Sequence, residues 1–387
     1  FYEVLATASH KALVTEVDKS ASASQATLLP TFGAELKRLV SVARGALKSH
    51  GVEPGDRVVL VAGNSTRWVA TDLAILGEGA IAVPLYARQA ANELAGMIKD
   101  AEPRVVIAEN EAMATELKTH IGTSFPVVLL ESLFGGHAPV NTPPHARAPS
   151  DTVTIIYTSG TSGEPKGVML SVANVDFMLP VIAGAIQAMS QGSPAGIRAA
   201  AARDGDDRVF HYLPLCFAGS RMVLWMCLFR GNGIMLSTNL ANLADEMKAA
   251  KPNYYLNVPF LLERVRLGVE KKLLEKPAPI RALWAKGKAA YDKVRSGKAT
   301  VVDKAVHAIA NRLVFKAIKA QIGVDLDCLI CGSAALPEDT QRWFEMIGIP
   351  VYQVYGLTET TAICTLDRPG QAQAGKVGWP ISGIEMR

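Results

Sequence analysis

Residues 157–167 read Tyr-Thr-Ser-Gly-Thr-Ser-Gly-Glu-Pro-Lys-Gly, directly after the apolar, β-branched segment 153–157. A strand that leads into such a loop suits a phosphate group, because glycines leave backbone N–H groups accessible and Lys166 supplies positive charge. The spacing is not that of a P-loop. Runs of Gly, Ser and Thr are also typical of surface linkers, but a linker rarely follows a buried strand directly. We therefore predict a phosphate-binding loop outside the P-loop family.

Apolar runs on both sides of this loop alternate with amphipathic segments. The predicted strands are residues 57–62, 80–85, 104–108, 126–130, 153–157, 208–213, 233–236, 254–258, 326–331 and 350–354. The predicted helices are residues 66–77, 92–101, 111–121, 218–229, 240–250, 260–272 and 337–347, and a helix through residue 188 that Ser171 caps. Apolar strands between helices are typical of parallel sheets covered on both faces. We predict an α/β fold of two doubly wound, mostly parallel sheets with flanking helices, with room for a small further β subdomain.

The length of 387 residues exceeds what one hydrophobic core usually fills. The proline-rich stretch 138–149 is interpreted as a linker between a first lobe, residues 1–149, and a second lobe, residues 150–387, which carries the predicted phosphate-binding loop. The basic segment 283–321 is interpreted as a solvated pair of helices. In doubly wound sheets ligands bind beyond the carboxyl ends of strands. Three loops rich in Gly, Ser and Thr are predicted there, at Thr158, Gly332 and Gly356.

Composition excludes several classes of protein. The net charge of +4 argues against a nucleic-acid surface, and apolar stretches such as 178–189 are too short for a membrane span. The five cysteines are sparse and odd in number, which indicates a reducing compartment such as the cytoplasm. Cys328 and Cys331 are expected to pack in the core, although a redox pair stays open. The start at Phe1, without a signal peptide pattern, and the end at Arg387 indicate a fragment.

A second motif follows the last predicted strand. Residues 353–361 read Gln-Val-Tyr-Gly-Leu-Thr-Glu-Thr-Thr. Tyr355 offers a flat ring for a purine, and Gly356 lets a ligand approach the backbone. Thr358 can donate its hydroxyl to a phosphate oxygen, and Glu359 is a suitable oxygen ligand for Mg²⁺. The alternative, a turn with a helix capping box, lacks the required Glu or Gln.

With Gly375-Lys376-Val377-Gly378, these motifs resemble the adenylate-forming superfamily of acyl-CoA synthetases, luciferases and nonribosomal adenylation domains. The resemblance extends from about residue 28 to residue 387, and the basic insert is similar to that of the long-chain fatty acyl-CoA synthetases. It implies that a carboxylic acid, preferably a medium- to long-chain fatty acid, attacks the α-phosphate of Mg·ATP. Coenzyme A then takes the acyl group from acyl-AMP. These small molecules are the expected partners, and long-chain acids add an expectation of peripheral membrane contact, although no amphipathic anchor is obvious.

The resemblance also implies roles for individual residues. The implied ATP-binding residues are Thr158, Ser159, Gly160, Thr161, Ser162, Gly163, Lys166, Gly332, Ser333, Ala334, Gln353, Val354, Tyr355, Gly356, Leu357 and Thr358. The implied catalytic residues are Lys166, Thr358 and Glu359, with Glu359 as the metal ligand. The implied acyl pocket contains Phe217, Trp225 and Gly332, and Phe217 replaces a histidine that is typical of the long-chain branch.

In this superfamily a ribose-binding aspartate, a hinge and a small C-terminal domain with a catalytic lysine follow the Gly-Lys-Val-Gly segment. We therefore expect this chain to be the large N-terminal domain alone, slow in adenylation and unable to complete the thioester. Three alternatives are kept: a non-catalytic nucleotide- or acyl-binding relative, a ligase for aryl or other acids, and a phosphotransferase. The last would need a catalytic base near the γ-phosphate, and the sequence offers no motif for one.

Overall fold

The computed structural model describes residues 1–19, 25–158, 164–192 and 207–386. The chain forms two compact units. Unit 1 contains Phe1–Gly184, Asp206–Ala250 and Leu357–Ala362, and unit 2 contains Ala185–Gly205, Lys251–Gly356 and Ile363–Arg387. The units therefore do not follow the expected division at residues 149 and 150, because the chain passes between them more than once.

The larger sheet of unit 1 has the strand order β6-β5-β3-β4-β7-β8 in the described part of the chain. Its strands are β3 (Arg57–Val61), β4 (Ile81–Leu85), β5 (Val105–Ala108), β6 (Val127–Leu129), β7 (Thr152–Thr158) and β8 (Lys166–Ser171). The strands from β3 to β7 pair in parallel, and β8 returns antiparallel to β7. Because β7 pairs with β4, the strand before the predicted phosphate-binding loop shares a sheet with the strands of the first lobe.

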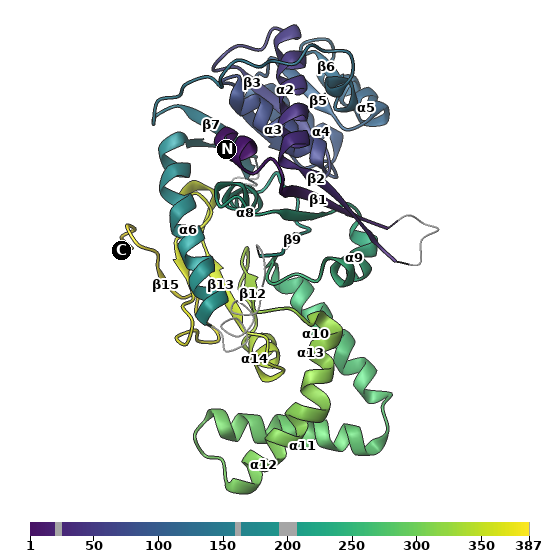
Figure 1. Cartoon of the computed structure of the whole chain (residues 1–387), viewed down its shortest axis with the longest axis vertical. Helices are drawn as coiled ribbons and strands as arrows, with labels where there is room; N and C mark the ends of the chain where they lie inside the picture. Colours follow the sequence, from purple (N-terminus) through teal and green to yellow (C-terminus); the bar gives the residue numbers. More distant parts are fainter. Residues whose placement is uncertain (20–24, 159–163, 193–206, 387) are drawn as a thin grey trace. The chain divides into compact units, whose positions relative to one another are not determined.

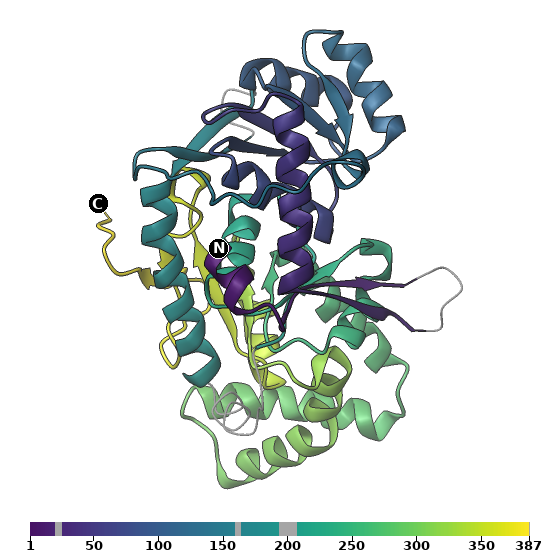
Figure 2. The same ribbon diagram turned by 45° about the horizontal axis from the view of Figure 1, so that its top comes forward.

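Helices cover both faces of this sheet (Figures 1 and 2). They are α2 (Gly33–Ser49), α3 (Thr66–Gly77), α4 (Ala91–Ala101) and α5 (Glu111–Ile121). Val59, Val83 and Val106 pack with Leu94 of α4 and Leu117 of α5 in one apolar core. Right-handed crossovers and the strand order place α3, which contacts α2, on the opposite face. Burial on both faces explains why these strands are continuously apolar.

The second sheet of unit 1 has the order β2-β1-β10-β9. Its strands are β1 (Ala12–Asp18), β2 (Thr27–Phe32), β9 (Val209–His211) and β10 (Ile234–Ser237). The hairpin of β1 and β2 was not predicted from the sequence. The other elements of unit 1 include α1 (Tyr2–Thr7), η1 (Glu131–Phe134), α8 (Ala218–Phe229), η2 (Leu240–Asn242) and α9 (Leu243–Ala250).

The sheet of unit 2 combines both pairing directions. Its strands, in spatial order, are β11 (Leu256–Asn257), β12 (Leu329–Cys331), β13 (Val351–Tyr355), β14 (Thr365–Leu366) and β15 (Trp379–Pro380). The first three are parallel and the last two antiparallel. Cys328 and Cys331 are buried free thiols, as core packing predicted. The α/β fold with mostly parallel sheets and flanking helices is thus confirmed.

The helices of unit 2 include α10 (Pro259–Leu274) and α14 (Glu338–Met346). The basic insert forms α11 (Ala278–Arg295), α12 (Val301–Ala310), a π-helical turn η3 (Asn311–Phe315) and α13 (Lys316–Gly323). The helices α11 and α12 pack on each other and lie at the end of unit 2 away from β12 and β13 (Figure 1). The insert therefore has more helices than the expected pair.

The proline-rich stretch 138–149 is not a linker between lobes. It connects η1 to β7 within unit 1 and crosses α2 (Figure 2). Arg44 is buried, donates to the carbonyls of Thr142 and Pro143, and forms an ion pair with Glu78 at 2.5 Å. The stretch supplies carbonyl acceptors to a buried arginine, and its prolines interrupt no helix or strand because the stretch lies outside regular structure.

Helix α6 (Val172–Gly192) begins after Ser171, whose Oγ accepts from the N–H of Asn174, as the predicted cap requires. Its window Val172–Met189 has a mean hydropathy of 1.5 and meets the length and composition of a membrane span. The expectation that all apolar stretches are too short was wrong on this criterion. A third of this window is buried, and the buried residues recur at helical spacing, so one face of the helix packs against the protein. They are Val175, Met178, Leu179, Ile182, Ile186 and Met189.

Candidate functional site

The strands β7 and β8 directly precede and follow the predicted phosphate-binding loop. Thr158 at the end of β7 is the register partner of Lys166 at the start of β8. Ser159, Gly160, Thr161, Ser162 and Gly163 lie outside the described residues. Lys166 is exposed, and among the described residues it has no ion-pair partner. The hairpin thus presents an uncompensated ammonium group beyond the carboxyl end of a strand in a doubly wound sheet, which is the expected position.

The second motif contacts this hairpin through Leu357–Ala362, a short segment that belongs to unit 1. The turn η4 (Thr358–Thr360) contacts β8. Ala362 packs with Val168 against a small core of Ile156, Leu170 and Ala218. The structure therefore brings the strand that begins with Lys166 against the turn that carries Thr358 and Glu359, although the two motifs are far apart in the sequence.

The backbone of this turn is held in an unusual conformation. Thr361 and Ala362 have φ angles of 58° and 82°, in the left-handed region that non-glycine residues rarely adopt. The Leu357 N–H donates to Thr360 Oγ1 at 2.9 Å, and the Ala362 N–H donates to the Leu357 carbonyl at 3.0 Å. Such strain persists where the surroundings enforce it and is concentrated at functional sites.

Glu359 is exposed on this turn and available as a metal ligand. No group of three or more His, Cys, Asp or Glu side chains suited to a metal occurs in the part of the chain that the structure describes. This arrangement fits Mg²⁺, which commonly takes one or two carboxylates and completes its shell with water and phosphate oxygens. It does not fit a dedicated protein cage.

In unit 2, the loops at Gly332 and Gly356 leave the same edge of the sheet, because β12 and β13 are parallel neighbours. A Cβ at Gly332 would lie 2.6 Å from Val354 Cγ2, so this close approach requires glycine. Ser333 follows with a φ of 71°, and it is exposed together with Ala334. Tyr355 is also exposed and so keeps its ring free for a ligand. The predicted adenine-contacting residues of unit 2 are therefore adjacent.

Gln353 is occupied by the protein itself. Its Nε2 donates to Gln341 Oε1 and to the Lys376 carbonyl, both at 2.8 Å. Its backbone N–H donates to Asp367 Oδ2 at 2.8 Å. Burial raises the pKa of Asp367 to about 6, while the Gln353 N–H acts in the opposite direction. Sequence reasoning missed Gln341 and Asp367, because nothing in the local pattern distinguishes a buried polar network from surface residues.

The two predicted acyl-pocket aromatics of α8 differ. Phe217 is exposed at the start of the helix, with its ring centroid 5.8 Å from that of Tyr86. Trp225 is buried, and its Nε1 donates to Asp72 Oδ2 at 3.1 Å. The guanidinium of Arg221 lies 4.5 Å from the centre of the Trp225 ring. Only Phe217 is therefore available to a ligand at the protein surface, whereas Trp225 packs in the core.

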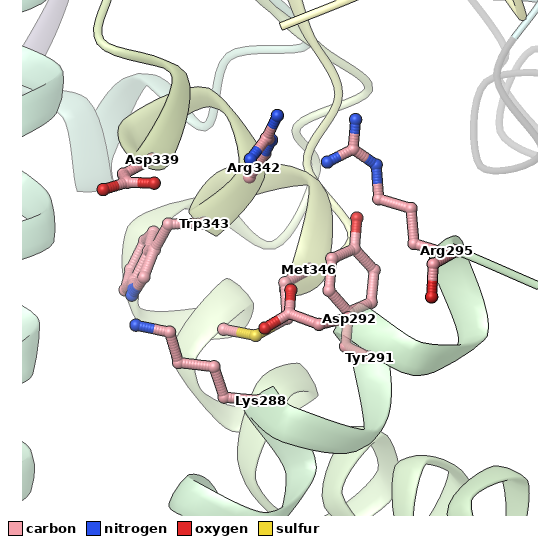
Figure 3. A pocket seen from close by; sticks show the side chains of 9 residues that line it. Lys288, Tyr291, Asp292, Arg295, Asp339, Arg342, Trp343 and Met346 are labelled. Carbon is pink, nitrogen blue, oxygen red and sulfur yellow. The ribbon is translucent and has the colours of Figure 1, made fainter. Parts of the chain in front are cut away.

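A cavity of about 580 Å³ lies elsewhere in unit 2, between α11 and α14 (Figure 3). Side chains from both helices line it, including Lys288, Tyr291, Arg295, Arg342 and Trp343. None of the residues predicted to bind ATP, metal or acid belongs to it. The candidate nucleotide site thus consists of loop ends and exposed groups rather than this cavity.

Comparison with known proteins agrees with the motifs. The family model "AMP-binding enzyme" matches residues 31–387. A long-chain-fatty-acid–CoA ligase of Mycobacterium bovis is 26% identical and aligns with 92% of this chain and 60% of its own length. Long-chain-fatty-acid–CoA ligase 5 of Rattus norvegicus is 27% identical, with 84% of this chain and 49% of its own length aligned. The chain therefore spans about half to three fifths of these curated relatives.

Solved structures show the same fold. ATP-bound MatB from Rhodopseudomonas palustris has a TM-score of 0.69 at 22% identity, over 99% of this chain and 65% of that one. A benzoate CoA ligase from Burkholderia xenovorans LB400 has a TM-score of 0.68 at 18% identity, over 99% of this chain and 65% of that one. Because the family model covers nearly the whole chain, the chain belongs to the AMP-binding enzyme family.

Proposed function

We propose that this chain is the adenylation domain of an acid–CoA ligase. It would bind Mg·ATP and a carboxylic acid and form acyl-AMP, from which coenzyme A later takes the acyl group. The observation that carries the proposal is the packing of β8, which begins with Lys166, against the turn that carries Thr358 and Glu359. The segments that carry a cation, a hydroxyl and a carboxylate therefore pack on each other in unit 1.

These groups suit attack at the α-phosphate. A carboxylate and a phosphate repel each other, so positive charge must offset the repulsion and stabilise the departing pyrophosphate. Lys166, with the hydroxyls and N–H groups of residues 158–163, would hold the β- and γ-phosphates. Thr358 would donate to the α-phosphate, and Glu359 would hold Mg²⁺, which supplies charge neutralisation when bound. No nucleophilic side chain is required, because the acid itself attacks.

In unit 2, Tyr355 would stack on the adenine, with Gly332, Ser333, Ala334, Val354 and Gly356 beside it. Gln353 would act through its hydrogen bonds, as a positioning residue for β13. Leu357 would orient the turn through its backbone. Each of these assignments rests on the motif, and those of Ser333, Ala334 and Tyr355 rest also on the exposure of the residue.

A medium- to long-chain fatty acid is the preferred substrate. The support comes from the names of the curated relatives and from the basic helical insert. The exposed Phe217 beside Tyr86 offers an apolar surface to an acyl chain. An aryl acid is the second candidate, because the solved structures of similar fold include a benzoate CoA ligase.

The test is acid-dependent exchange of labelled pyrophosphate into ATP, with octanoate, palmitate and benzoate as acids. We expect exchange with at least one fatty acid and a loss of about 100-fold or more in Lys166→Gln and in Glu359→Gln. Lys37→Gln, at an exposed lysine of α2, is the matched control and should retain the parent rate. Exchange that needs no acid, or formation of ADP in place of AMP, would overturn the proposal.

A further inference from the structure

The positive charge of this chain is concentrated in one segment. Residues 278–323, which form α11, α12, η3 and α13, contain ten of the 40 lysine and arginine residues but two of the 36 acidic residues. The segment therefore carries a formal charge of +8, while the rest of the chain carries −4 and the whole chain +4. A partner that meets this segment meets a strongly basic surface on an otherwise mildly acidic molecule.

The same segment exposes an apolar face. Val301, Val302, Ile309 and Leu313 are 85%, 70%, 50% and 62% exposed. At helical spacing these positions, together with the exposed Ala305 and Ala308, lie within one arc of the helix. Lysine and arginine residues stand within or beside the arc. They are Lys298, Lys304, Arg312 and Lys316, all of them exposed. We call this set of apolar and basic residues the α12 surface.

The opposite face of this helical run accounts for its folding. Ala310, Val314 and Phe315 are buried, and the His307 ring lies between those of Tyr291 and Phe315, with centroids 5.8 and 6.1 Å away. Thr300 and Asp303 form a capping box at the start of α12. The helix is therefore fixed without its outer apolar residues, so packing and capping do not explain why valine, isoleucine and leucine occupy the exposed arc.

We propose that the α12 surface docks on the face of an anionic lipid bilayer. Basic side chains are drawn to the negative potential of such a surface, and the apolar side chains between them enter the headgroup region. An apolar face bordered by cations, on a helix too short to span a membrane, is typical of interfacial binding. A nucleic acid would use the charge but would leave the apolar arc in water. The inference does not depend on which acid the chain activates.

The proposal revises the expectation that the chain has no evident amphipathic anchor. Val301 and Val302 are adjacent in the sequence, and cations interrupt the arc at Lys304 and Arg312. The sequence alone therefore shows no regular apolar stripe, and the arc becomes evident only from the helix boundaries and the buried face.

The test is sedimentation of the chain with phosphatidylcholine vesicles and with vesicles in which about a third of the lipid is phosphatidylglycerol. We expect binding to the anionic vesicles only, with affinity falling as salt is raised from about 50 to about 500 mM. The double variant Val301→Asp/Val302→Asp should weaken binding at least tenfold. Both positions lie in the first helical turn, where acidic residues are favourable, so the fold should be retained.

Lys298→Gln/Lys304→Gln tests the cations separately and should weaken binding by about fivefold for each charge removed. Leu29→Asp is the matched control, because Leu29 is 49% exposed on β2, and this variant should bind as the parent does. Equal binding to both kinds of vesicle would overturn the proposal, as would unchanged binding in the double valine variant. Concentration-dependent self-association, measured by light scattering and lost in that variant, would assign the surface to a second copy of the chain instead.

Discussion

Asp72 of α3 and Arg221 of α8 form an ion pair, 2.7 Å between Oδ1 and Nη2, with at most 1% of either side chain exposed. Removing one partner of such a pair leaves an uncompensated buried charge. We expect Asp72→Asn to lower the free energy of unfolding by about 3–5 kcal/mol, measured by urea denaturation. Trp68 and Trp225 flank the guanidinium, so tryptophan fluorescence reports on this region.

The control for that prediction is the surface ion pair of Arg38 and Glu35, also 2.7 Å apart. Because both side chains are solvent-exposed, Arg38→Gln should cost no more than about 1 kcal/mol. Removal of both charges, in Asp72→Asn/Arg221→Met, keeps an oxygen acceptor for Trp225 Nε1 and should recover stability relative to Asp72→Asn. A double variant as unstable as Asp72→Asn would contradict this account.

Asp367 predicts a pH dependence of stability. Its pKa is raised to about 6 in the folded chain, so between its unfolded pKa near 4 and pH 6 the folded state binds the proton more tightly. Stability should therefore fall as the pH rises through this window. Asp367→Asn keeps an oxygen acceptor for the Gln353 N–H and should be more stable than the parent by about 1–3 kcal/mol at pH 7, with the gain absent at pH 4. A gain that is the same at both pH values would disprove the assignment.

Gly332 allows a comparison between two glycine substitutions. Gly332→Ala places a Cβ against Val354 and should destabilise unit 2 by about 1–3 kcal/mol and weaken ATP binding. Gly268 lies inside α10 with no atom within 4 Å of the position that a Cβ would take. Gly268→Ala should therefore stabilise the helix by up to about 1 kcal/mol and leave ATP binding unchanged. Thermal unfolding and an ATP titration together measure both effects.

Variants of Ser333 test whether the surrounding structure enforces the left-handed backbone conformation beside Gly332. Its φ of 71° is open to glycine but unfavourable for a β-branched residue. Ser333→Gly should retain the melting temperature within a few degrees. Ser333→Val should lower stability by about 1–2 kcal/mol, and equal melting temperatures for the two variants would show that the loop relaxes freely.

The helices of the doubly wound sheet could be predicted to the residue where local signals mark their ends. Ser65 and Asn110 cap α3 and α5, whose bounds agree with the predicted ranges. The strand β8 could not be predicted in this way, because Lys166 and Gly167 continue a loop-like composition. It exists because its backbone pairs with β7, and the absence of a Cβ on Gly167 leaves room for Ile155 Cγ2, which would lie 2.8 Å away, and for the Tyr157 ring.

The candidate site shows the same limit more clearly. Its residue types were evident from two motifs, but the packing of η4 on β8 joins segments separated by most of the second half of the chain. The buried pair of Asp72 and Arg221 is likewise invisible to any local pattern. Tertiary packing decides such pairings, and local periodicity and turn residues carry no information about it.

All five cysteines are buried free thiols, so the folded chain should react slowly with thiol reagents. Thiolates, not thiols, react with oxidants and alkylating agents, and burial raises the pKa of Cys216, Cys227 and Cys331 to about 12. A native molecule at neutral pH should therefore consume almost no alkylating reagent. Any labelling that does occur requires part of the chain to open, so the rate of thiol alkylation reports the rate of local or global unfolding.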